Sequence, residues 1–87
     1  MNAKNWLVKT SLGNMAYAKV PMSALSVNDM VLYNYGVYKV TFKETVNRIN
    51  HFEMKLIGYD SLERGDFNPT PYESMAGSDG TTVTAVF

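Results

Sequence analysis

The chain contains no cysteine, and this absence excludes a disulfide framework, thiolate catalysis and a zinc–thiolate site. No hydrophobic run approaches the length of a membrane-spanning helix. Residues 1–10 hold no apolar stretch of the length that signal peptides need. Small secreted domains often carry disulfides, so we expect a cytoplasmic protein that does not associate with membranes.

The chain also lacks net charge. Eight lysines and arginines balance eight aspartates and glutamates, which disfavours strong generic attraction to nucleic acid or to an anionic membrane. Apolar side chains are abundant: 46% of the residues are hydrophobic and 13% are aromatic, as in a folded globular domain. A chain of 87 residues accommodates one hydrophobic core, so we expect a single domain over residues 1–87.

Alternation of apolar and polar residues is the strongest pattern in the sequence. Tyr38, Val40 and Phe42 occupy every second position, which is the spacing of one face of a β-strand. The expected strands are residues 5–12, 15–20, 30–33, 37–43, 51–59 and 81–87. Five or six short strands with tight turns indicate an all-β fold, and at this length a small, partly open antiparallel barrel. Barrel closure would remove the exposed sheet edges.

Glycine and proline mark the expected turns. The pair Gly13-Asn14 is typical of a two-residue hairpin turn with positive φ. Pro21 ends the next strand because it has no N–H to donate, and a bend or a single helical turn should follow it. Gly36 is available for a left-handed position in the loop 34–36, and residues 47–50 form the loop of a later hairpin.

The segment 60–80 differs in composition, because glycine, proline, serine and aspartate are frequent in it. We therefore expect a loop-rich insertion before the last strand. Within the insertion, Thr70-Pro71-Tyr72-Glu73 matches a capping box with proline at the first helical position. This motif predicts one short helix near 71–76.

The segment Leu25-Ser26-Val27-Asn28-Asp29, followed by a strand, a tight loop and Val37-Tyr38-Lys39-Val40, resembles the opening hairpin of small SH3-like barrels. In those modules a leucine-x-valine-glycine-aspartate sequence leads into the first strand. The likeness extends from Leu25 to about Tyr59 and departs at Asn28, where glycine is usual. It implies an SH3-like barrel and no particular activity, because such folds host many unrelated functions.

Reactive side chains are few. His51, the only histidine, shares a strand face with Glu53, but no third residue completes a metal site, and an ordinary exposed pair is the simpler interpretation. The carboxylates of the loop-rich segment lack the spacing of a calcium loop: Asp60, Glu63, Asp66 and Glu73. Residues 77–80 lack the lysine and the helix of a phosphate loop. We therefore expect no enzyme activity, no cofactor and no metal.

Apolar strand surface exceeds what one small domain should hide. Residues 30–33 are apolar on both faces, and Val37 and Ile57 fall on otherwise outward faces. Either the loop-rich segment covers the second face or a partner does. We predict a protein partner, with self-association favoured, and the expected contact residues are Tyr33, Tyr35, Val37 and Ile57.

A single-stranded nucleic-acid surface is the alternative, because aromatic rings interleaved with cations stack bases and neutralise phosphates. Its residues would be Tyr35, Lys39, Lys43, Arg48 and Lys55. The absence of net charge makes this less favoured. A small-ligand pocket at the barrel mouth is a third option.

Overall fold

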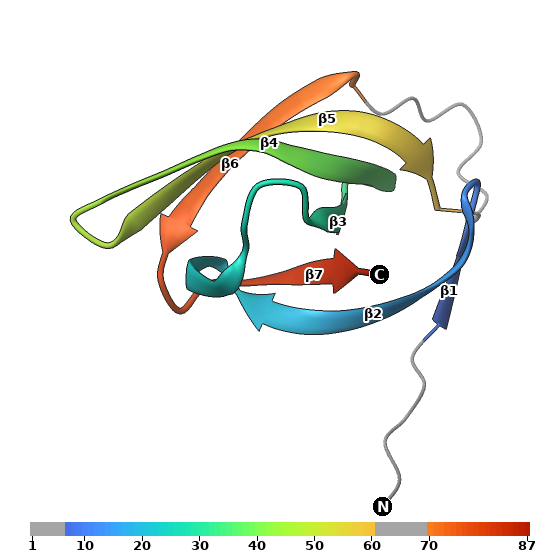
Figure 1. The fold of residues 1–87 in the computed structure, drawn as a ribbon, viewed down its shortest axis with the longest axis horizontal. Coiled ribbons are helices and arrows are strands. Elements are labelled where there is room, and N and C mark those ends of the chain that lie inside the picture. Colours follow the sequence, from blue (N-terminus) through green and yellow to red (C-terminus); the bar gives the residue numbers. More distant parts are fainter. Residues whose placement is uncertain (1–6, 61–69) are drawn as a thin grey trace, which may run out of the picture.

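The protein is described by a computed structural model that covers residues 7–60 and 70–87. Over these residues the chain forms one open antiparallel sheet of seven strands in the order β1-β2-β7-β3-β4-β5-β6 (Figure 1). One 3-10 turn, η1 (Met22–Ala24), follows β2. The strands are β1 (Leu7–Thr10), β2 (Gly13–Pro21), β3 (Met30–Tyr33), β4 (Gly36–Val46), β5 (Ile49–Tyr59), β6 (Tyr72–Ser78) and β7 (Thr82–Val86). The prediction of an all-β fold is confirmed, as is the helical turn after Pro21.

The expected barrel of five or six strands is wrong. The described residues form seven strands, and the two edge strands, β1 and β6, do not pair with each other. The short helix near 71–76 is also wrong, because these residues belong to β6. The Thr70 hydroxyl donates to the Glu73 carboxylate, which is a contact between side chains and not the side chain-to-backbone pairing of a capping box. The chain stays extended, because β5 offers a free edge to which all seven residues of β6 pair. Of the expected loop 60–80, residues 61–69 lie outside the described residues.

The first hairpin turns two residues earlier than predicted. Thr10 pairs with Gly13, so Ser11 and Leu12 form the turn and Asn14 already lies in β2. Gly13 has a φ of 110° immediately after the turn, a place where hairpins often need a left-handed residue. Gly13 therefore correctly predicted a hairpin, but the central residues of its turn are Ser11 and Leu12 and not Gly13 and Asn14.

The other two hairpins use asparagine in place of glycine. Asn34 and Tyr35 have φ values of 53° and 68°, and Asn47 and Arg48 have φ values of 52° and 64°. Two consecutive left-handed residues are characteristic of the type I′ turn, whose twist matches that of the strands it joins. Gly36, expected to supply the left-handed position, is buried at the start of β4.

Two hydrophobic clusters lie on opposite faces of the central strands. Val31 belongs to the first cluster, whereas its neighbours Met30 and Leu32 pack against the second. Successive side chains of a strand point to opposite faces, so β3 is covered on both faces by its own chain. The expectation that a partner must cover residues 30–33 is therefore wrong. The first cluster consists of Met22, Leu25, Val31, Tyr38, Val40, Phe52 and Met54, and the second of Met15, Val37 and Val86.

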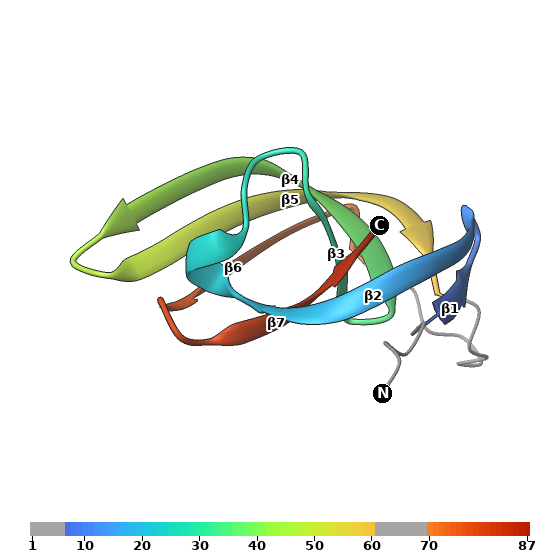
Figure 2. The same ribbon diagram turned by 60° about the horizontal axis from the view of Figure 1, so that its bottom comes forward.

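The second cluster is closed by β1, β2 and the end of β5. Val8 and Tyr17 pack on it from the first two strands, and Ile57 packs on it from β5. A bulge places Ile57 there, because the pairing passes from Val37–Gly58 to Tyr38–Leu56 and leaves Ile57 without an opposite residue. Figures 1 and 2 both show the end of β5 lying beside the turn between β1 and β2.

A second bulge, at Thr41, reverses the faces of the outer half of β4. The pairing passes from Val40–Met54 to Phe42–Glu53, so Thr41 is the extra residue. Phe42 would otherwise continue the buried row of Tyr38 and Val40, but it is 44% exposed. The β4–β5 hairpin extends well beyond β3 (Figure 1).

Candidate interaction surface

The four predicted contact residues do not form one surface. Val37 has 0% exposure, so no partner can reach its side chain, and its assignment as a contact residue is wrong. Ile57 packs on the second cluster. Tyr33 packs on the first cluster, with its ring edge-to-face against Tyr38 at a centroid distance of 6.1 Å. Of the four residues, only Tyr35 is largely exposed to solvent.

The predicted nucleic-acid residues are likewise dispersed. Tyr35 and Arg48 lie in the turns at opposite ends of β4, which has 11 residues and therefore spans about 35 Å. The bulge at Thr41 turns the Lys43 side chain toward the interior of the protein. Its ammonium donates to the carbonyls of Ser23 at 3.1 Å and Leu25 at 2.7 Å. Lys43 is thus committed to an internal structural role.

Lys39 and Lys55 are the two cations that the fold does bring together. They are directly opposite one another across β4 and β5. On the next strand Tyr72 is opposite Lys55, and its side chain is exposed. The three residues form one row across the sheet, and the sequence alone did not place Tyr72 in it.

Three exposed residues lie where the β1–β2 turn, the β3–β4 turn and the end of β5 come together. They are Leu12, Tyr35 and Tyr59, which are 51%, 42% and 49% exposed. We call these three residues the tyrosine end of the sheet. Tyrosine buries a large, rigid surface at low cost in side-chain entropy, and it is enriched at protein interfaces.

Backbone hydrogen bonds hold the three segments together. The Ser11 N–H donates to the Tyr59 carbonyl at 2.8 Å, and the Tyr59 N–H donates to the Ser11 hydroxyl at 2.9 Å. The Asp60 N–H donates to the Tyr35 carbonyl at 3.2 Å, and Asp60 also forms an isolated bridge with Thr10. The tyrosine end is therefore built on fixed backbone.

Close packing also fixes Leu12. A Cβ atom added to Gly58 would lie 2.9 Å from Leu12 Cγ and 2.9 Å from Ser11 Oγ. Only glycine lets the β1–β2 turn approach β5 so closely. Leu12 and Tyr59 were missed in the sequence because their proximity depends on this long-range contact, and nothing local marks it.

The backbone of Tyr35 is strained for its residue type. A φ of 68° is left-handed, and this conformation costs a bulky residue about 1–2 kcal/mol. Type I′ turns prefer asparagine followed by glycine, and this turn has asparagine followed by tyrosine. Such outliers concentrate at functional sites.

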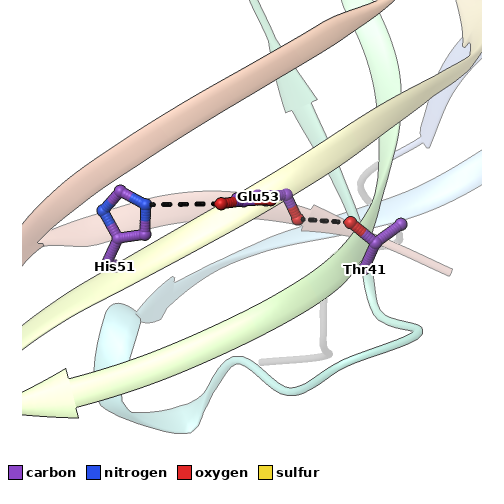
Figure 3. A network of polar contacts seen from close by, with 3 residues as sticks. All are labelled: Thr41, His51 and Glu53. Atoms are coloured by element: carbon purple, nitrogen blue, oxygen red, sulfur yellow. Dashed lines mark hydrogen bonds and ion pairs between the residues drawn. The ribbon is translucent and has the colours of Figure 1, made fainter.

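His51 and Glu53 share a strand face, as predicted. Their Nε2 and Oε2 atoms are 4.0 Å apart, and both side chains are exposed (Figure 3). The Thr41 hydroxyl donates to the Glu53 carbonyl at 3.1 Å. An exposed pair of this kind contributes little to stability. Within residues 7–60 and 70–87, no group of three or more candidate ligands could hold a metal ion.

Two of the four predicted carboxylates, Asp60 and Glu73, belong to the described residues. Asp60 joins the bridge to Thr10, Glu73 accepts from Thr70, and Glu63 and Asp66 lie outside the described residues. Next to Glu73, the Tyr38 hydroxyl donates to the Thr70 carbonyl at 2.6 Å. Burial raises the pKa of Tyr38 above the usual tyrosine value, although the Thr70 side chain lowers it in part.

A groove of about 430 Å³ opens on the first cluster between β6 on one side and β3 and β7 on the other. The groove is lined by polar and apolar surface alike: Met22, Tyr33, Met75 and Val83 are among its lining residues, and Lys19 is the charged one. A volume of this size lies within the range of ligand-binding clefts.

No protein-family model, no curated protein and no solved structure matches the chain. The resemblance of residues 25–59 to SH3-like modules therefore stays a prediction. In the described part of the chain, none of the helical structure is long and apolar enough to cross a membrane.

Proposed function

We propose that the protein is a small, non-enzymatic binding and assembly module that contacts another protein through the tyrosine end, a second copy of the chain being the first partner to test. The absence of cysteine suits a reducing compartment, and we propose the cytoplasm. The observation that carries this proposal is that three exposed apolar or aromatic residues, Leu12, Tyr35 and Tyr59, lie on three segments joined by hydrogen bonds.

Two features support the tyrosine end over the residues predicted from sequence. The side chains of the tyrosine end are exposed, whereas Val37 and Ile57 already pack in the second cluster. Its backbone is held by hydrogen bonds from three segments, so a partner would not have to order it on binding. The exposed apolar side chains at the hairpin tip, Val46 and Ile49, lie at the opposite end of β4 and provide a control.

Sedimentation velocity over a wide concentration range tests the proposal. We expect the mass of the wild-type protein to rise above that of one chain with concentration. Tyr59→Ser and Leu12→Ser should each weaken association at least tenfold, which corresponds to about 1.4 kcal/mol. Val46→Ser, which removes an equally exposed apolar side chain, should leave association unchanged.

A monomeric mass at the highest concentration, together with no partner recovered when the tagged protein is used as bait, would contradict the proposal. Equal weakening by Val46→Ser would contradict the choice of surface. Circular dichroism of each variant separates loss of binding from loss of fold.

A single-stranded nucleic-acid surface is the second candidate, and the row of Lys39, Lys55 and Tyr72 favours it. An exposed aromatic ring beside two cations can stack a base and neutralise phosphates, at about 1–3 kcal/mol for the stacked base. Fluorescence anisotropy with a mixed-sequence oligonucleotide tests it. Binding should weaken steeply as salt is raised and should be lost in Tyr72→Ser, whereas apolar self-association should depend little on salt.

A further inference from the structure

The edge of β6 has unpaired backbone groups. The Leu56 N–H donates to the Pro71 carbonyl at 2.8 Å, which fixes the phase of the ladder between β5 and β6. In an antiparallel pair alternate residues bond to the partner strand and the others point away from it. The N–H and C=O groups of Ser74 and Ala76 therefore point away from β5. Over the described residues no strand pairs with this edge.

The groove on the first cluster runs along this edge. Met75 and Ala76 line one side of it, and Tyr33 and Val83 line the other. The strand β7, across the groove, is already paired on both sides by β2 and β3. An added strand in the groove would thus bond to β6 alone and would bury the partly exposed side chains of the first cluster.

The charge of the groove indicates what kind of strand would fit. Lys19 is the charged residue of its lining. Within the described residues no ion pair or hydrogen bond engages the Lys19 ammonium, so none of these residues neutralises its charge. An incoming segment with a carboxylate would supply the complementary charge.

We propose that the groove binds an extended peptide segment of another protein, which adds as a strand to the open edge of β6, buries aliphatic side chains against Met75 and Val83, and places a carboxylate beside Lys19. Main-chain hydrogen bonds to Ser74 and Ala76 provide affinity, and the side-chain contacts provide selectivity. This site is separate from the tyrosine end and does not depend on self-association.

The probe is a capped six-residue peptide in which valine alternates with polar residues, one of them aspartate. It is titrated to millimolar concentration into the isotopically labelled protein while the amide chemical shifts are followed. We expect shifts at Ser74, Ala76 and Val83. The same peptide with alternate amides N-methylated, so that its strand hydrogen bonds cannot form, should bind about tenfold more weakly or less.

Variants of the protein test each contact. Ala76→Pro removes an N–H that points away from β5, so the ladder to β5 stays intact, and peptide binding should be lost. Ala76→Thr keeps that N–H and should bind. Lys19→Glu should weaken the aspartate peptide about threefold and favour a lysine-containing peptide instead, whereas Arg48→Glu, the same charge change at the hairpin tip, should have no effect.

Several outcomes would overturn the inference. One is the absence of amide shifts in β6 at millimolar peptide, and another is shifts confined to a different face of the protein. A third is equal binding of the N-methylated peptide, which would indicate that apolar contacts hold the peptide without strand addition. A dimer that Ala76→Pro abolishes would mean that a second copy occupies the edge instead. If Ala76→Pro fails to fold, the N-methylated peptide still decides. Tyr59→Ser should retain peptide binding, so failure here and failure of the proposed assembly surface are distinguishable.

Discussion

We predict that removing the buried side chain of Asn50 lowers the stability of the protein substantially. This side chain is 1% exposed at the start of β5. The amide oxygen accepts from the Thr45 hydroxyl at 2.8 Å, and the amide nitrogen donates to the Gly77 carbonyl at 3.3 Å and to the Asp79 carboxylate at 2.9 Å. One buried side chain thus ties β4 and β5 to the end of β6 and to the turn that leads into β7.

Asn50→Ala removes all three hydrogen bonds. Neutral bonds contribute about 0.5–1.5 kcal/mol each and a bond to a charged group about 1.5–3 kcal/mol. The weak geometry of the Gly77 contact places the expected loss near 3 kcal/mol. Domains of this size are stable by roughly 4–13 kcal/mol, so the loss would be a large fraction of the total.

Urea denaturation followed by circular dichroism measures this loss. A matched pair of variants tests the cause: Asn50→Asp places a carboxylate against Asp79 and should cost at least as much as Asn50→Ala. The double variant Asn50→Asp with Asp79→Asn restores a carboxylate–amide contact and should recover part of the loss. A free energy of unfolding for Asn50→Ala within about 0.5 kcal/mol of wild type would refute the reasoning.

Three further predictions concern single positions. Tyr38→Phe should cost about 1 kcal/mol at neutral pH, because the Thr70 carbonyl loses its donor. Because the pKa of Tyr38 is raised in the fold, its contribution is complete below about pH 10 and is lost at higher pH, so Tyr38→Phe should flatten the alkaline fall in stability seen by denaturation at successive pH values. Gly58→Ala should lower the free energy of unfolding by about 1 kcal/mol and weaken association, because the new Cβ displaces Leu12. An unchanged melting temperature would contradict the packing described. Tyr35→Gly should lower the free energy of unfolding, measured by chemical denaturation, by only about 1 kcal/mol, because relief of the left-handed backbone offsets part of the lost packing. The variant should nevertheless weaken self-association. A free energy of unfolding lowered by more than about 3 kcal/mol would show that the ring serves the fold alone.

Period-two alternation was enough to predict the class of fold and the middle of the longest strands. It failed at the two bulges, because one extra residue moves every later side chain to the opposite face. Thr41 turns Phe42 outward and Lys43 inward, and Ile57 turns toward the second cluster. Nothing in the local sequence marks these positions.

The helix predicted near 71–76 failed for a different reason. A capping box needs bonds from its two side chains to backbone N–H groups, whereas the Thr70 and Glu73 side chains bond to each other, and the free edge of β5 offers a full ladder to the extended chain. Tertiary pairing outweighs local preference there. The candidate site could be predicted only in part for a similar reason. Tyr35 is exposed as expected for a hairpin turn, whereas Leu12 and Tyr59 become its neighbours only through contacts between distant segments.

The central functional claim is that the tyrosine end is where the chain meets its partner. Amide chemical shifts recorded over a wide range of protein concentration test it most directly, because they report the contact surface of self-association residue by residue. We predict concentration-dependent shifts at Leu12, Tyr35 and Tyr59 with little change at Val46 and Ile49. Shifts confined to the hairpin tip, or spectra that do not change while the mass stays that of one chain, would contradict the claim.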